Sequence, residues 1–110
     1  MSTCYALALS AGDQSAAYQA GVLQGLAEIY SAGEANYTAV SGVSGGAVNA
    51  AILANFAVGS ELSAADAMKA FWDASTNATL YKEWPGGLAE GLLIKGGLYN
   101  QAPMRKFLTE

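Results

Sequence analysis

A short glycine-rich segment, Gly42-Val43-Ser44-Gly45-Gly46, constrains the fold of this chain more than any other part of its sequence. The run before it, Tyr37 to Ser41, is β-branched and aromatic, which predicts a strand. The run after it, Ala47 to Val58, is apolar and predicts a helix ended by Gly59. A serine in so tight a strand-to-helix turn must adopt strained backbone angles. The residues two positions before and two positions after this serine must be small, because the strand and the helix approach closely there.

The segments before this turn predict a second strand and a second helix. Cys4 to Ser10 is a short apolar run that does not alternate with polar residues, so we expect a buried strand of a parallel sheet. Residues 11–15 are expected to form a loop. Ala16 to Tyr30 predicts a helix, because apolar side chains recur there at helical spacing, at Tyr18, Val22, Leu26 and Ile29.

The segments after the turn are mostly helical in character. A third helix is expected to begin at Ser63, which forms a capping box with Asp66. One face of that helix is expected to be buried, at Ala67, Met68, Phe71 and Trp72. Leu88 to Ile94 fits a short helix or a strand equally well. Asn100 is expected to cap a last helix, Met104 to Glu110.

The order strand, helix, strand, helix predicts an α/β fold with parallel strands. Two parallel strands leave two open edges and do not cover both faces of a sheet. We therefore expect residues 1–110 to be the N-terminal part of a larger domain, whose remaining segments lie beyond Glu110.

The composition excludes several kinds of site. The 110 residues contain no histidine and one cysteine, Cys4, so they hold no Ser-His-Asp triad, histidine metal site or intrachain disulfide. The formal net charge of −4 gives no electrostatic footprint for nucleic acid. No apolar run is long enough for a transmembrane span or a signal peptide, so localisation stays open. No cofactor is expected.

Ser44 is the candidate catalytic residue. A G-x-S-x-G turn between a strand and a helix exposes the serine hydroxyl at the positive end of the helix, where the Gly45 amide can stabilise an oxyanion. Two other interpretations remain: a plain Gly-Ser turn, and a phosphate cradle. The second is disfavoured because the segment lacks the Gly-Lys-Ser/Thr ending of a P-loop.

Other polar and aromatic residues have a structural and a functional interpretation. Tyr18 and Gln19 are both expected to be packing residues of their helix. Gln19 is also expected to form a hydrogen bond with the loop. Asn49 either braces the loop or is simply a buried, satisfied amide. Core packing is favoured over an acyl-chain groove for the aromatic residues Phe71, Trp72, Tyr81 and Trp84.

Three segments together resemble the patatin-like phospholipases, a family of serine lipid acyl hydrolases. The first is Leu7 to Ser10 followed, after the loop, by Ala17-Tyr18-Gln19-Ala20-Gly21-Val22-Leu23. The second runs from Val40 to Ala51 and contains the glycine-rich turn. The third, Gly97 to Arg105, is similar to the family's G-[LI]-[YF]-D-x-x-P-L-R segment. They occur in the family's order and span most of the chain.

The resemblance implies a Ser-Asp dyad with Ser44 as nucleophile, Gly42 and Gly46 as the small residues of the turn, and an oxyanion hole from Ala11, Gly12, Asp13 and Gly45. The family's general base lies in a later D-G-[GA] motif, which is absent here, so it is expected beyond Glu110. The family's loop has three glycines, a variable residue, a basic residue and a further glycine. In residues 11–16 Gly12 keeps its glycine, and Ser15 replaces the basic residue.

Three functions follow as hypotheses. The first is a serine hydrolase that acts on acyl esters of glycerolipids, soluble or peripheral at a membrane surface. The second is a catalytically inactive patatin-like domain that binds lipid or protein. The third is an acyltransferase that shares the turn and uses a downstream histidine as its base.

Overall fold

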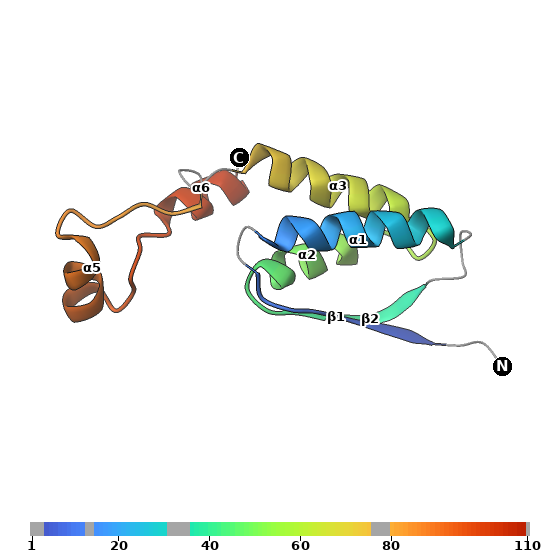
Figure 1. Ribbon diagram of the computed structural model, residues 1–110, viewed down its shortest axis with the longest axis horizontal. Coiled ribbons are helices and arrows are strands. Elements are labelled where there is room, and N and C mark those ends of the chain that lie inside the picture. Colours follow the sequence, from blue (N-terminus) through green and yellow to red (C-terminus); the bar gives the residue numbers. More distant parts are fainter. Residues whose placement is uncertain (1–3, 13–14, 31–35, 76–79, 110) are drawn as a thin grey trace. The chain divides into compact units, whose positions relative to one another are not determined.

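The computed structural model describes residues 4–12, 15–30, 36–75 and 80–109. These residues divide into two compact units, Met1–Trp72 and Asp73–Glu110. Figure 1 shows their helices and strands.

The first unit is an α/β arrangement around a parallel pair of strands. Strand β1 (Tyr5–Leu9) leads through helix α1 (Ala16–Ile29) to strand β2 (Tyr37–Gly42). The strands are parallel, with Leu7 opposite Val40 and Leu9 opposite Gly42. Helices α2 (Gly45–Ala54) and α3 (Glu61–Ala74) follow. The predicted α/β fold with parallel strands is therefore confirmed.

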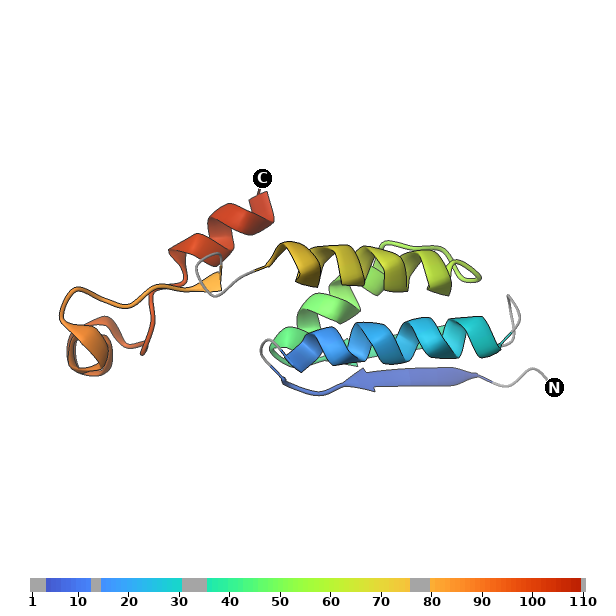
Figure 2. The same cartoon turned by 45° about the horizontal axis from the view of Figure 1, so that its top comes forward.

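The helices of this unit lie on one face of the sheet (Figures 1 and 2). Helix α2 contacts both strands and also packs against α1. Between these layers lies a small core of apolar side chains: Leu9, Ala16, Ala20, Leu23, Leu53, Ala64, Ala65, Met68 and Trp72. Among the described residues, Asn49 of α2 is the buried polar side chain in this core.

Helix α1 forms as predicted but buries a different face. The expected apolar stripe is largely exposed, since Tyr18 and Ile29 are each 77% accessible and Val22 is 43% accessible. The buried residues are Ala16, Ala20 and Leu23. Helix α1 packs against α2, and Asn49 of α2 bonds the Ala16 carbonyl. Alanine on the packed face lets two helix backbones approach, whereas tyrosine would hold them apart.

The predicted bounds of α2 and α3 were wrong. Helix α2 begins two residues earlier than expected and ends at Ala54 rather than Val58. Helix α3 begins at Glu61, so Ser63 is its third residue and does not cap it. Instead, the Glu61 carboxylate accepts a hydrogen bond from the Gly59 N–H at 3.1 Å. Gly59, at φ 96°, makes the turn before the helix.

The second unit contains short helical segments joined by turns. Helix α5 (Gly87–Glu90) continues into the π-helical turn η2 (Gly91–Lys95), which shows that the undecided segment Leu88 to Ile94 is helical. Helix α6 (Ala102–Thr109) follows and begins two residues before the expected Met104. The Asn100 Oδ1 atom accepts a hydrogen bond from the Ala102 N–H at 2.9 Å, so Asn100 satisfies the first N–H group of the helix, as expected, although Gln101 is the residue directly before it.

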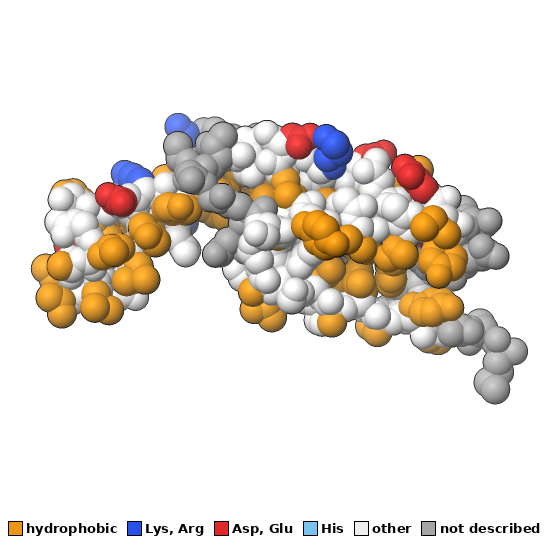
Figure 3. Space-filling view, in the orientation of Figure 1, with side chains coloured by type: hydrophobic (Ala, Val, Ile, Leu, Met, Phe, Trp, Pro, Cys, Tyr) orange, Lys and Arg blue, Asp and Glu red, His pale blue; other side chains and the backbone are white. Residues whose placement is uncertain are grey.

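Helix α5 and the turn η2 carry four exposed apolar side chains: Leu88, Leu92, Leu93 and Ile94. Figure 3 shows hydrophobic side chains gathered over this part of the second unit. Within the described residues, no helix combines the length and the apolar character that a membrane span requires.

The core of the first unit yields a stability prediction. Met68 is fully buried, whereas Leu62 on the same helix is 43% accessible. Met68→Ala should lower the free energy of unfolding by about 2–5 kcal/mol, because it removes buried apolar contacts and leaves a cavity. Leu62→Ala should cost clearly less. Urea unfolding of both variants tests this, and equal losses would contradict the assignment of the core.

Candidate active site

The turn between β2 and α2 holds Ser44 in an unusual backbone conformation. Strand β2 ends at Gly42 and α2 begins at Gly45, so Val43 and Ser44 alone connect them. Ser44 has φ 56° and ψ −123°, and among the described residues it is the one non-glycine residue with a positive φ. Such angles are costly for a residue with a Cβ, and they persist only where the surrounding structure enforces them.

Close backbone packing on both sides enforces this conformation. A Cβ atom on Gly42 would meet the carbonyl group of Gly46 at less than 3.0 Å. A Cβ atom on Gly46 would meet the carbonyl oxygens of Leu9 and Ser10 at less than 3.0 Å. The Val43 N–H also donates to the Leu9 carbonyl at 3.1 Å. The first turn of α2 therefore rests directly on the end of β1.

The Ser44 side chain is exposed and stands at the N-terminus of α2. Within the described part of the chain, its hydroxyl makes no hydrogen bond, and neither does the Gly45 N–H. Unpaired N–H groups at the start of a helix attract negative charge. The arrangement thus places a hydroxyl beside an amide that can bind an oxyanion.

The other predicted oxyanion residues follow β1. Ala11 is exposed and Gly12 is half-buried, and the Gly12 carbonyl accepts a hydrogen bond from the Ser15 N–H at 2.6 Å. Neither Ala11 nor Gly12 has a positive φ. Alanine at position 11 therefore fits the observed backbone without strain. Asp13, the remaining predicted member, lies outside the described residues.

Asn49 connects the three helices of the first unit through its carboxamide group. Its Nδ2 donates to the Ala16 carbonyl and to Gln19 Oε1, each at 2.9 Å. Its Oδ1 accepts a hydrogen bond from Trp72 Nε1 at 2.8 Å. A buried amide costs stability unless its hydrogen bonds are made, and those of Asn49 are made.

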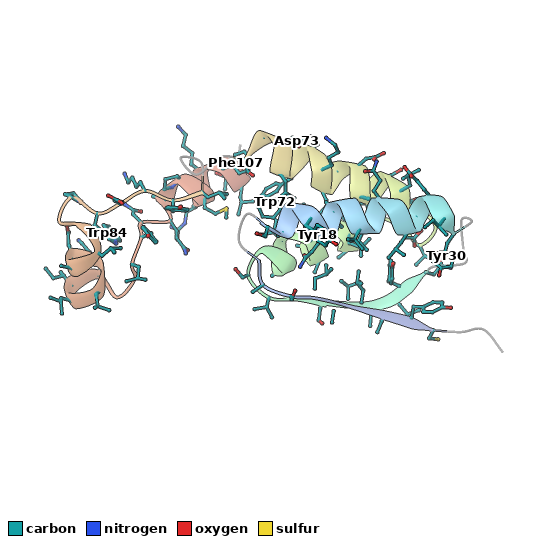
Figure 4. The ribbon with its side chains drawn as sticks, in the orientation of Figure 1. Tyr18, Tyr30, Trp72, Asp73, Trp84 and Phe107 are labelled. Atoms are coloured by element: carbon teal, nitrogen blue, oxygen red, sulfur yellow. The ribbon has the colours of Figure 1, made fainter. Side chains whose placement is uncertain are left out.

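Gln19 continues this network to the loop after β1. Its Nε2 donates to the Ser10 carbonyl at 2.7 Å. We call the series Trp72, Asn49, Gln19 and the Ser10 carbonyl the amide chain. Figure 4 labels Trp72, which lies under α3 beside the start of α1. The end of β1 is thus held both by α2 and by the amide chain.

The observed roles of several of these residues differ from those expected from the sequence. We expected Tyr18 to be a packing residue, and it is exposed. The hydrogen bond from Gln19 to the loop, which we expected in addition to packing, is present. Trp72 is buried as expected and forms an edge-on ring contact with Phe71, but its hydrogen bond to Asn49 was missed. In the second unit, Tyr81 contacts Tyr99 and Trp84 donates to the Gly97 carbonyl.

Partial burial, together with the negative charge of Glu61, raises the pKa of Tyr37, which lies at the other end of β2 from Ser44. In the part of the chain that the structure describes, no three carboxylate or thiol groups gather as they would around a metal ion.

The close packing at Gly46 yields a second prediction. Gly46→Ala should lower the free energy of unfolding by about 1–3 kcal/mol or more, because the added methyl group meets backbone carbonyls that cannot move aside. Gly21→Ala on α1 is the matched control. Its Cβ meets nothing within 4 Å, so it should be neutral or stabilise by about 0.5–1 kcal/mol. Thermal or urea unfolding compares the two, and an unaffected Gly46→Ala variant would contradict the packing.

Comparison with known proteins finds one match, which is to a protein family. No curated protein and no solved structure matches the chain. Residues 7–110 match the family model described as patatin-like phospholipase, and this range includes the Ser44 turn, the loop after β1 and the amide chain. The chain therefore belongs to the patatin-like phospholipase family.

Proposed function

We propose that this chain carries the nucleophile of a serine hydrolase that cleaves acyl esters of glycerolipids. The observation that carries the proposal is the backbone of Ser44, at φ 56°, which exposes a hydroxyl at the N-terminus of α2. Membership of a family of lipid acyl hydrolases supports the substrate class. Contact with a membrane surface is part of the proposal, and the exposed apolar side chains of α5 and η2 fit such contact.

In the proposed reaction, Ser44 Oγ attacks the ester carbonyl carbon while its proton passes to an aspartate that acts as general base. The N–H groups of Gly45 and of the loop residues Ala11, Gly12 and Asp13 stabilise the resulting oxyanion. The ester C–O bond then breaks, the alcohol leaves with the proton, and Ser44 is acylated. Water then attacks the acyl carbonyl carbon while the aspartate takes its proton. The bond between this carbon and Ser44 Oγ breaks, the carboxylic acid leaves, and the proton returns to Ser44 Oγ.

The aspartate of the proposed dyad is not among residues 1–110. The chain contains no histidine, and none of its aspartates is followed by glycine. Asp66 is exposed on α3 and accepts a hydrogen bond from Gln24 Nε2 at 3.3 Å. Asp73 belongs to the last turn of α3. We therefore place the base in a D-G-[GA] segment beyond Glu110, which makes residues 1–110 the N-terminal part of the catalytic domain.

The first test is ester hydrolysis by the full-length protein. Ser44→Ala should lower kcat/KM by about 10⁴-fold or more, because it removes the atom that attacks the ester. Ser63→Ala, an exposed serine on α3, should change kcat/KM by less than twofold. Hydrolysis that survives in Ser44→Ala would contradict the proposal. No hydrolysis by the unaltered protein would favour a lipid- or protein-binding role.

The second test uses the 110-residue chain alone. It should show at most trace hydrolysis, because a serine hydroxyl without a general base is a weak nucleophile. The measurement is the initial rate on a chromogenic acyl ester, with the Ser44→Ala form of the same chain as the blank. Turnover of about 1–10³ s⁻¹, the ordinary range for enzymes, would contradict the placement of the base beyond Glu110.

A further inference from the structure

The amide chain has a fixed direction, which follows from the groups at its two ends. The indole N–H of Trp72 is only a donor, so the oxygen of the Asn49 amide must face it. The Asn49 nitrogen then faces the Gln19 oxygen and the Ala16 carbonyl, which is only an acceptor. The Gln19 nitrogen is left to donate to the Ser10 carbonyl. No amide in this chain can be reversed without losing hydrogen bonds.

The last hydrogen bond of the chain sets the orientation of one peptide group. The Ser10 carbonyl and the Ala11 N–H belong to the same peptide unit, and the described chain contains no cis peptide bond. In a planar trans peptide, the C=O and the N–H point in opposite directions. Holding the Ser10 oxygen toward Gln19 therefore directs the Ala11 N–H away from it.

The Ala11 N–H is available for a ligand in this orientation. Within the described residues, it donates no hydrogen bond. Its peptide group is also restrained from the other side, because the Ser10 carbonyl lies against Gly46 in the first turn of α2. The amide chain and the Ser44 turn thus meet at one peptide bond.

We propose that Gln19 is a positioning residue, whose amide aims the Ala11 N–H as an oxyanion donor, and that Asn49 and Trp72 hold Gln19 in place. This inference rests on the proposed role of Ser44. Gln19 touches no substrate; it acts through the peptide bond between Ser10 and Ala11. Losing the hydrogen bond removes one of the two restraints on this peptide, so the Ala11 N–H is aimed less well in the transition state while the ground-state binding of the ester is retained.

The test compares two glutamine substitutions on α1 in the full-length protein. Gln19→Met keeps the length of the side chain and removes the donor. Gln24→Met is the matched control, because Gln24 bonds the exposed Asp66 and lies outside the amide chain. Gln19→Met should lower kcat on the order of 10- to 100-fold, with KM within about twofold, whereas Gln24→Met should leave both within about twofold.

A second variant tests whether the amide must reach the Ser10 carbonyl. Gln19→Asn keeps the amide but is one methylene too short to reach Ser10, so it should lose kcat as Gln19→Met does. Each variant is assayed well below its own unfolding midpoint, where stability does not limit the rate. An unchanged kcat in either variant, or a raised KM at unchanged kcat, would overturn the role of Gln19. If the unaltered protein has no Ser44-dependent hydrolysis, it is the proposed function that fails.

Discussion

The contact between the first turn of α2 and the end of β1 is the constraint on which the rest of the first unit depends. The Gly46 backbone lies so close to the Leu9 and Ser10 carbonyls that no side chain fits between them. With strand β2 ending at Gly42, two residues must reverse the chain, and Ser44 takes the positive φ that this reversal requires. The exposed hydroxyl at the start of α2 is a consequence of this packing, as is the position of the loop that follows β1.

The buried Asn49 amide is the second constraint, and it couples the helices to that contact. An unsatisfied amide in the core would be costly, so α1, α2 and α3 must keep the arrangement in which its hydrogen bonds are made. Through Gln19 the same arrangement reaches the Ser10 carbonyl. The buried Asn49 is thus connected, through two hydrogen bonds, to the carbonyl group that precedes Ala11. The hydrogen bonds of Asn49 and Gln19 therefore link the packing of the core to the candidate oxyanion donors.

The elements that depend on the local pattern of residues could be predicted from the sequence. The strand, the tight turn and the helix around Ser44 follow from a β-branched run, a glycine-rich turn and a small apolar run, and the structure has all three. The buried face of α1 could not be predicted in this way, because it depends on which neighbour Ala16 and Ala20 meet. The same holds for Asn49, whose hydrogen bond to the Ala16 carbonyl joins residues 33 positions apart. The catalytic roles assigned to Ser44, Ala11, Gly12, Asp13 and Gly45 stay predictions.

Reaction with a fluorophosphonate shows whether Ser44 is an activated nucleophile. The full-length protein is treated with the reagent, and the modified peptide is identified by mass spectrometry. The reagent reacts with a serine that a base activates and leaves ordinary surface serines unmodified. We expect one adduct per chain, on Ser44. An adduct on a different serine, or no adduct on a folded full-length protein, would show that Ser44 is not the nucleophile.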